Sequence, residues 1–228
     1  MPIKNFAIVP ARSGSRRILN KNLQDICGKP LLYWTLKAAT EAECIHKIFV
    51  STDSYEYIKI IEGLIALYGF KNTYAIPRKA EHSTARSQLE EFILPLLQKN
   101  ECSNVFILQP TSPVRLPDTI DNAYKHFRET KADSLVTTYE MKDFIWKDGK
   151  PNYNVDKRPR SQEYKSDLCF ESGSVYITKY KTFLEHHNRL GGKIETFPLQ
   201  PEEVFQIDDP LDFVICAAIL KHIYKETI

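Results

Sequence analysis

The sequence predicts an α/β protein whose mainly parallel sheet is flanked by helices. Short apolar runs rich in Val, Ile and Phe alternate with helical patterns of about 10–15 residues, which is typical of βαβ units. Strands joined by helices run mainly parallel. Up to Glu129, the expected strands are Phe6–Val9, Lys47–Ser51, Tyr74–Ile76 and Val105–Leu108, and the expected helices are Leu31–Glu41, Tyr55–Leu67, Ala85–Gln98 and Pro117–Glu129.

Local signals place the ends of several helices. Pro30 suits the first helical position, and Ser83 or Thr84 is expected to be the N-cap of the third helix. Near the end of the chain, Asp209 reads as an N-cap with Pro210 at the first helical position. A long apolar stripe from Phe213 to Tyr224 continues this last helix.

The pattern changes after Ser134. A strand is expected at Leu135–Tyr139, but 142–165 is polar and contains the hairpin signal Asp148-Gly149. Strand character returns at Ser174–Thr178 and at Ile194–Leu199. We expect the middle section to leave the sheet as a β-rich arm, to rejoin it, and to pack against a second subunit.

Composition and charge exclude several classes of protein. The chain of 228 residues is 43% hydrophobic and 26% charged, as in folded globular proteins, and we expect one domain over 1–228. A net charge of +2 argues against a nucleic-acid partner. The sequence shows neither a signal peptide nor a run of roughly 18 apolar residues, so we expect no membrane partner. Five widely spaced cysteines without a C-x-x-C pair predict reduced thiols in the cytoplasm.

The segment from Pro10 to Asn22 predicts a polyphosphate site. It follows the first expected strand, contains small residues, and carries the cations Arg12, Arg16, Arg17 and Lys21. Backbone N–H groups and these cations suit phosphate oxygens. The segment has neither the Walker spacing nor G-x-G-x-x-G, and a solvated basic loop is the alternative. Its position beyond a strand end favours the ligand site.

Three other polar segments are expected at the same edge of the sheet: Ser51–Ser54, Gln109–Pro113 and Gln206–Asp209. Cations opposite a carboxylate suit metal-assisted nucleotidyl transfer. Asp208, at the end of an expected strand Val204–Ile207, is the best candidate Mg²⁺ ligand. Asp53 reads more readily as a helix cap than as a ligand. The alternative role for Gln109 is to satisfy backbone groups of its turn.

These motifs together resemble the cytidylyltransferases that activate acidic sugars, namely the acylneuraminate (nonulosonic acid) and 3-deoxy-manno-octulosonate enzymes. The similarity covers nearly the whole chain in order. The matching segments are Ile8–Asn22, Gly28–Leu31, Val50–Asp53, Leu108–Arg115, Glu171–Ile177 and Ile207–Phe213.

The resemblance implies a Rossmann-like fold of the nucleotide-diphospho-sugar transferase type. It also implies a reaction in which CTP and an acidic nine-carbon 2-keto sugar give a CMP-sugar and pyrophosphate, with Mg²⁺ as the cofactor. Arg12, Lys21 and Asp208 would be catalytic and Gln109 would contact the sugar. The CTP site would comprise Ala11, Arg12, Ser13, Gly14, Ser15, Arg16, Lys21 and Asn22.

The chain departs from this family pattern on the metal and sugar side. Gln206 stands where an aspartate often precedes Asp208, so Asp209 or Asp212 is a candidate substitute. Glu171 adds a negative charge close to the expected site of the acidic sugar. Arg158 and Arg160 are therefore candidates for the sugar carboxylate.

Family members commonly form homodimers in which a middle segment reaches the neighbour's active site. The resemblance therefore implies that residues 138–175 dimerise. Three alternatives remain open from the sequence: CMP-octulosonate synthesis, another sugar nucleotidyltransferase, and a non-catalytic nucleotide-binding paralogue.

Overall fold

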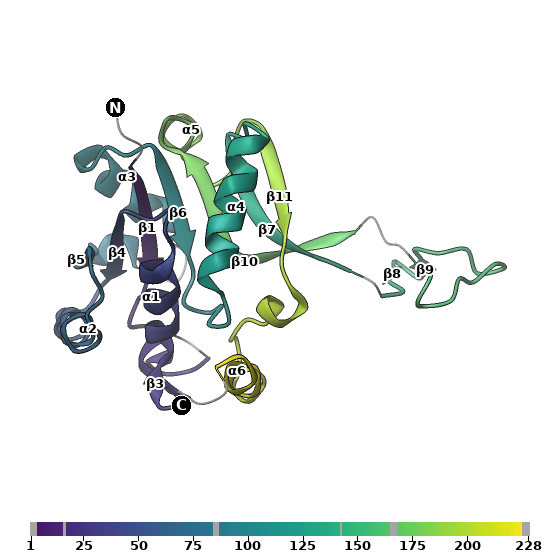
Figure 1. Ribbon diagram of the computed structural model, residues 1–228, viewed down its shortest axis with the longest axis horizontal. Helices are drawn as coiled ribbons and strands as arrows, with labels where there is room; N and C mark the ends of the chain where they lie inside the picture. Colours follow the sequence, from purple (N-terminus) through teal and green to yellow (C-terminus); the bar gives the residue numbers. More distant parts are fainter. Residues whose placement is uncertain (1–3, 16, 84–86, 142, 165–167, 225–228) are drawn as a thin grey trace.

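A seven-stranded sheet forms the centre of the protein (Figure 1). The computed structural model describes residues 4–15, 17–83, 87–141, 143–164 and 168–224. The strand order is β11-β7-β10-β6-β1-β4-β5. In chain order these strands are β1 (Asn5–Pro10), β4 (Lys47–Thr52), β5 (Thr73–Pro77), β6 (Asn104–Leu108), β7 (Ser134–Glu140), β10 (Cys169–Lys179) and β11 (Ile194–Pro198).

The sheet is mainly parallel, as expected. Strand β1 pairs in parallel with β4 and β6, β4 with β5, and β11 with β7. Strand β10 runs antiparallel to both of its neighbours, β6 and β7. The carboxyl ends of β1, β4, β5 and β6 therefore lie at one edge, and β10 enters the sheet from that edge.

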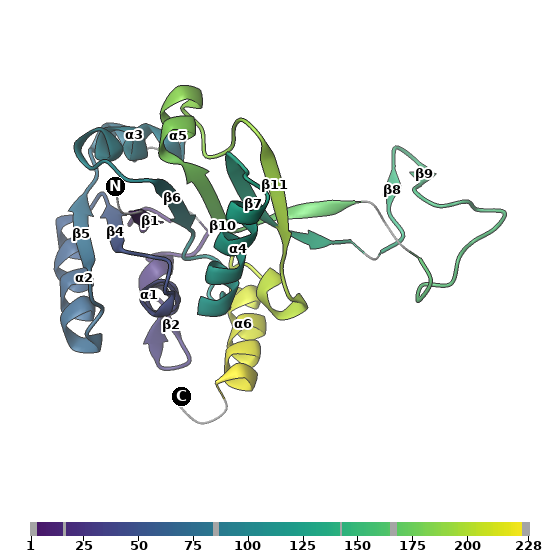
Figure 2. The ribbon, with the colours of Figure 1, turned by 45° about the horizontal axis from the view of Figure 1, so that its top comes forward.

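Helices cover both faces of the sheet. In chain order they are α1 (Leu31–Glu41), α2 (Tyr55–Tyr68), α3 (Leu89–Lys99), α4 (Pro117–Glu129), α5 (Tyr180–His186) and α6 (Pro210–Ile223). Buried side chains of α1, α2 and α4 form one core with the sheet, while α3 and α5 contribute to a second core. Figure 2 shows α3 and α5 together above the sheet and α1 below it.

Strand β1 shows how one sequence serves both cores. Ala7 and Val9 belong to the core under α1, whereas Phe6 and Ile8 belong to the core under α3. Alternate side chains of a strand point to opposite faces, so a strand buried on both sides needs a continuous apolar run. The run that the sequence shows is thus explained by the two helical layers.

Helix α6 and the start of α1 form a third core with the segment around β2 (Asp25–Ile26) and β3 (Lys29–Pro30). Asp209 is the N-cap of α6, Pro210 begins the helix, and Asp212 completes a capping box. Pro30 precedes α1 as its N-cap, one position before the expected one. The last helix of the chain is therefore fixed at its first turn, next to the polar edge of the sheet.

Two expected elements differ in the structure. Helix α3 begins at Leu89, later than expected, and Gln88 rather than Ser83 precedes it; Thr84 lies outside the described residues. Ser83 instead donates to the carbonyl of Lys79. The expected strand at Val204–Ile207 is wrong, because Pro201–Val204 forms a 3₁₀ helix and the chain then continues without regular structure.

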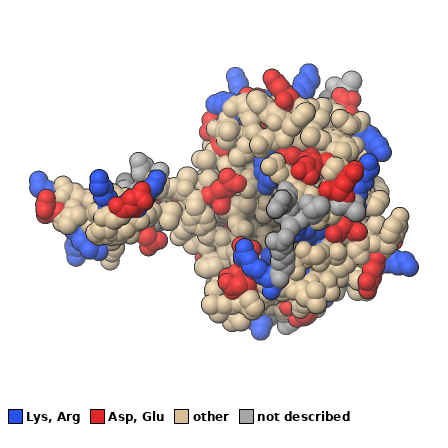
Figure 3. Space-filling model, turned by 180° about the vertical axis from the view of Figure 1, so that it is seen from behind, with Lys and Arg blue, Asp and Glu red and all other residues tan. Residues whose placement is uncertain are grey.

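The middle section projects from the body as an arm, as expected (Figure 1). Within it β8 (Trp146–Lys147) pairs with β9 (Lys150–Pro151) across Asp148 and Gly149, both at positive φ, which suits a tight hairpin. Among its described residues, regular strand is limited to this hairpin and the outer ends of β7 and β10. Figure 3 shows the arm standing clear of the body with charges of both signs. None of the described helices is long and apolar enough to span a membrane.

Candidate active site

The basic loop after β1 is tied to the end of β4. The backbone N–H of Ala11 donates to the carbonyl of Ser51 at 2.8 Å, and that of Ser13 donates to Oδ1 of Asp53 at 2.7 Å. The expectation that Asp53 caps α2 is therefore wrong. The adjacent Ser54 is the N-cap, and its side chain accepts from the N–H of Tyr57. Asp53 holds the loop instead.

Lys21 joins this loop to the segment before α6. Its ammonium donates a 2.6 Å hydrogen bond to the carbonyl of Ile207 and lies 3.6 Å from Oδ1 of Asp208. Arg17 Nη1 lies 3.5 Å from the same carboxylate oxygen. The Lys21 side chain is only 14% exposed, whereas that of Asp208 is 60% exposed. The carboxylate is therefore paired with cations and still open to a ligand.

The turn after β6 lies beside the basic loop and the segment before α6 and is the third segment at this edge of the sheet. Ile207 N–H donates to the carbonyl of Thr111 at 2.7 Å, which fixes the segment before α6 against this turn. Inside the turn, the N–H of Ser112 donates to the carbonyl of Gln109. The fully buried guanidinium of Arg115 donates to the same carbonyl at 2.9 Å and also to Ser174. Arg115 thus connects the turn to β10.

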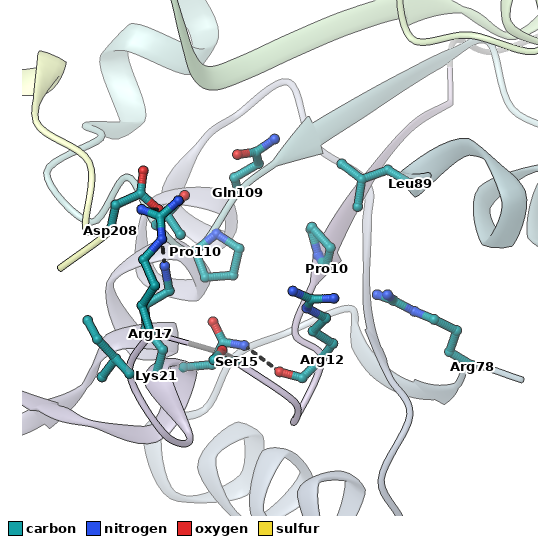
Figure 4. A pocket seen from close by; sticks show the side chains of 13 residues that line it. Pro10, Arg12, Ser15, Arg17, Lys21, Arg78, Leu89, Gln109, Pro110 and Asp208 are labelled. Atoms are coloured by element: carbon teal, nitrogen blue, oxygen red, sulfur yellow. Dashed lines mark hydrogen bonds and ion pairs between the residues drawn. The ribbon is translucent and has the colours of Figure 1, made fainter. Parts of the chain in front are cut away.

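A cavity of about 420 Å³ opens between these segments (Figure 4). Six of the residues expected in the site line it, namely Arg12, Ser15, Lys21, Asn22, Gln109 and Asp208. The other lining residues are Pro10, Arg17, Ile18, Arg78, Leu89, Pro110 and Thr111. Figure 4 shows Gln109 between Asp208 on one side and Leu89 on the other. The sequence therefore predicted the principal charged parts of this pocket.

Other expected residues lie elsewhere in the structure. Ala11 is buried, and neither Ser13 nor Gly14 lines the cavity; Arg16 lies outside the described residues. The carboxylate of Asp209 accepts from the N–H of Leu211 and Asp212, and that of Asp212 accepts from the N–H of Asp208 and Asp209. Both of these carboxylates serve the capping box rather than the cavity.

Arg158 and Arg160 lie in the arm and do not line the cavity of their own chain. The Arg158 guanidinium lies 4.6 Å from the ring centre of Phe144 and 5.2 Å from that of Tyr153. Arg160 lies 3.8 Å from Glu163.

Arg78 is a pocket residue that the sequence reasoning missed. It follows the edge strand β5, and its guanidinium donates to the carbonyl of Ser51 at 3.1 Å and lies 3.7 Å from the ring centre of Phe92. Figure 4 shows the Arg78 and Arg12 guanidinium groups turned toward each other. A cation directly after the strand at 73–77 was the available signal, because that strand ends at the same edge as β1.

Burial alters the titration of two of these cations. Desolvation lowers the pKa of Lys21, although the nearby Asp208 carboxylate acts in the opposite direction. Burial likewise lowers the pKa of Arg78 to about 10, with Arg12 contributing to the decrease and Asp53 opposing it. Partly desolvated cations of this kind attract an anionic ligand more strongly than fully hydrated ones.

Glu171 faces a second cavity, of about 560 Å³, that shares Leu89 with the first. Its carboxylate accepts the hydroxyl of Tyr176. In the same wall the carboxylate of Glu90 accepts two hydrogen bonds from the guanidinium of Arg189, at 2.6 and 3.1 Å. The Glu171 carboxylate therefore lies beside the first cavity, and Tyr176 is its hydrogen-bond partner.

Comparison with known proteins places this site in a family. A model of the cytidylyltransferase family matches residues 6–213. The chain belongs to the cytidylyltransferase family. The N-acylneuraminate cytidylyltransferase A of Danio rerio is 28% identical over 219 residues, covering 92% of this chain and 49% of that protein. The CMP-N,N'-diacetyllegionaminic acid synthase of Legionella pneumophila is 29% identical over 229 residues, covering 95% and 96%. This cytidylyltransferase chain thus spans about half of the first relative.

Solved structures confirm the Rossmann-like fold of this cytidylyltransferase. A CMP:2-keto-3-deoxy-manno-octonic acid synthetase complexed with CTP has a TM-score of 0.69 and 17% identity, covering 96% of this chain and 99% of the other. A 4-diphosphocytidyl-2C-methyl-D-erythritol synthase from Anaerococcus prevotii has a TM-score of 0.70 and 15% identity, covering 96% of both chains.

The pocket of this cytidylyltransferase fits a metal ion that is shared with a nucleotide. Asp208 is the only acidic residue among the described residues that line it. Throughout the described ranges, no group of three or more His, Cys, Asp or Glu side chains could hold a metal. Mg²⁺ keeps several waters and commonly binds through one or two carboxylates together with substrate phosphates. An exposed carboxylate beside Lys21 and Arg17 suits that arrangement.

Proposed function

We propose that this chain transfers the cytidylyl group of CTP to the anomeric hydroxyl of an acidic nine-carbon 2-keto sugar and releases pyrophosphate. The observation that carries the proposal is the meeting of the basic loop with Asp208 in one pocket of a cytidylyltransferase chain. The names of the two relatives indicate the acceptor class, a sialic, legionaminic or related acid.

The cationic side of the pocket would bind the triphosphate. Arg12, Lys21, Arg17 and Arg78 line it and come from two different loops. The amide of Asn22, which is buried, donates to the carbonyl of Arg12 at 3.0 Å and so fixes the loop that carries this guanidinium. We assign Arg12 and Lys21 to the phosphates and Asn22 to the cytidine. Cations held in advance by the fold can stabilise charge without reorganising during the reaction.

Asp208 would hold Mg²⁺ beside Lys21 and Arg17, which both lie within 3.6 Å of its carboxylate. When bound, the ion supplies charge neutralisation to the phosphate oxygens and orients the α-phosphate. The proposal places the ion on Asp208 alone, because Asp209 and Asp212 accept backbone N–H groups at the start of α6. It needs no second carboxylate at Gln206.

The chemical step is a displacement at the α-phosphorus. The anomeric hydroxyl oxygen of the sugar forms a bond to this phosphorus, and the bond to the oxygen that bridges the α- and β-phosphates breaks. The electron pair of that bond leaves with pyrophosphate. The hydroxyl proton passes to a base. Asp208, the carboxylate that lines the pocket, would accept this proton. Lys21 and Arg12 stabilise the charge that develops on the leaving group.

The arm would complete the acceptor side in a homodimer. It carries exposed apolar side chains, among them Trp146, which is 59% exposed, and Val155, which is 62% exposed, and its half-buried Phe144 and Tyr153 rings lie against Arg158. A second copy covering the arm would bury this surface and bring Arg158 and Arg160 toward the neighbour's pocket. Light scattering tests this, because Trp146→Glu should convert a dimer to a monomer without loss of folding. We also propose a cytoplasmic setting, since CTP is the donor and all five cysteines are free thiols.

The activity is tested by pyrophosphate release. The protein is supplied with Mg²⁺, each of the four nucleoside triphosphates in turn, and a panel of nine-carbon and eight-carbon keto-sugar acids. Release with CTP and a nine-carbon acid supports the proposal. Release with only an eight-carbon acid would assign the chain to octulosonate activation. CTP binding without release across the panel would favour a non-catalytic paralogue.

A further inference from the structure

We propose that Gln206 binds the acceptor acid together with Gln109, and that these two amides select the acceptor. The inference rests on the proposed cytidylyl transfer and adds a specificity residue to it. It gives a role to the neutral side chain that precedes Asp208 by two positions.

The two amides meet over one glycine. Gly173 has a φ of +66° and lies in the irregular part of β10 between Glu171 and Tyr176. A Cβ atom at this position would lie 3.3 Å from Oε1 of Gln109 and 3.3 Å from Nε2 of Gln206. A side chain here would crowd both amides and would have to adopt the left-handed backbone conformation, so glycine suits this position. Segments far apart in the sequence thus place two amides side by side.

Both amides come from well-fixed backbone. The carbonyl of Gln109 accepts from Arg115 at 2.9 Å, and the same guanidinium also donates to Ser174, next to Gly173. Gln206 precedes Ile207, which is fully buried, donates to Thr111 and accepts from Lys21. The spacing of the two amides is therefore set by the fold before any ligand arrives, which lowers the entropy cost of binding.

The two amides are also available for binding. Within the part of the chain that the structure describes, no hydrogen bond engages the side chain of either glutamine, and both are half-buried. A half-buried amide gains from a ligand that satisfies its donors and acceptor. Gln109 lines the cavity, and Gln206 lies two residues from Asp208, which lines it as well.

The chemistry of the pair suits a hydroxylated acid. Each amide offers two N–H donors and one carbonyl acceptor, and hydroxyl and N-acyl groups offer the matching set. A carboxylate at position 206 would instead repel an acidic acceptor. The neutral side chain keeps negative charge away from the acceptor and leaves Asp208 as the acidic residue of the pocket.

Steady-state kinetics with Gln206→Ala test the inference. We expect the KM for the acceptor to rise about tenfold, as for one or two lost hydrogen bonds, while the KM for CTP stays within about twofold. Gln206→Glu should raise the acceptor KM further, because it adds a like charge. Gln200→Ala is the matched control, since Gln200 is exposed in the same segment and away from the pocket. It should behave as wild type.

Gly173→Ala perturbs the same two amides without replacing either glutamine. Thermal unfolding of each variant reports whether the fold is intact. An unchanged acceptor KM in Gln206→Ala would overturn the inference and leave the proposed function standing. So would a Gln206→Glu variant that turns over faster at lower Mg²⁺, since position 206 would then belong to the metal side. A wild-type protein that is inactive with every acid would overturn both.

Discussion

Lys21 and Asp208 come from opposite ends of the chain and lie side by side in the pocket. The ammonium lies 3.6 Å from the carboxylate and is anchored by a 2.6 Å hydrogen bond to the carbonyl of Ile207. The contact brings the basic loop and the proposed metal ligand together before any substrate binds. The site is therefore assembled by the fold rather than by the nucleotide.

Replacement of Asp208 by Asn should reduce pyrophosphate release by about 100-fold or more, because the pocket loses its only described carboxylate. The fold should be unaffected, since this side chain is largely exposed. Asp209→Ala is the matched control. It removes the cap of α6 and should lower the free energy of unfolding by about 1 kcal/mol with activity retained. Near-normal turnover in Asp208→Asn would contradict the metal assignment.

Asp53 and Ser54 should separate loop positioning from helix capping. Asp53→Ala removes the acceptor of the Ser13 N–H, so we expect weaker CTP binding by about tenfold with little change in stability. Ser54→Ala removes the cap of α2 and should cost about 1 kcal/mol of stability with normal CTP binding. Calorimetry and chemical unfolding measure the two effects. The reverse pattern would restore Asp53 to the helix.

The pH dependence of CTP binding should report on Lys21 and on Arg78, whose pKa burial lowers to about 10, and a Lys21 variant isolates the contribution of the lysine. Burial lowers the pKa of this ammonium from its ordinary 10.5, so the cation is lost at a lower pH than that of an exposed lysine. CTP affinity should therefore fall on the alkaline side before pH 10.5. Lys21→Arg keeps its charge and should move this fall to higher pH. Titrations of CTP binding that superimpose for the two proteins would show that Lys21 does not set the alkaline limb.

Arg115 should support both the stability of the fold and the part of the pocket proposed to bind the sugar. Its guanidinium is fully buried and donates to Gln109, Ser174 and Thr35. Arg115→Met removes the donor to Ser174 and Thr35 and one of the two donors to the Gln109 carbonyl, and we expect the free energy of unfolding to fall by about 3 kcal/mol. Arg128→Ala, on the surface groove of α4, is the control and should change stability by less than about 0.5 kcal/mol. Equal stability of Arg115→Met and wild type would show that the buried contacts contribute nothing net.

Much of the fold follows from the sequence because its signals are local. The apolar runs of β1, β4 and β6 and the helix at Pro117–Glu129 lie where the periodicity predicts them. The hairpin at Asp148-Gly149 follows from the backbone preferences of that pair. The antiparallel direction of β10 does not follow, because a hydrophobic pattern looks the same in both directions.

The parts that could not be predicted depend on tertiary contacts. Asp53 and Ser54 are adjacent residues that can both cap a helix, and only the approach of the Ser13 N–H decides between them. Residues 204–207 have the composition of a strand, but Ile207 pairs with the turn at Thr111 instead of joining the sheet. Arg78 is one cation in a loop, and its place in the pocket depends on the position of β5 at the edge of the sheet.

The most direct measurement of the proposed reaction is phosphorus NMR of the products formed from CTP, Mg²⁺ and a nine-carbon keto-sugar acid. We predict equal amounts of pyrophosphate and of a CMP phosphodiester whose mass equals CMP joined to the acid with loss of water. With Asp208→Asn, both products should form at least about 100-fold more slowly. Formation of CDP and inorganic phosphate, or pyrophosphate without the sugar phosphodiester, would contradict transfer to the anomeric hydroxyl.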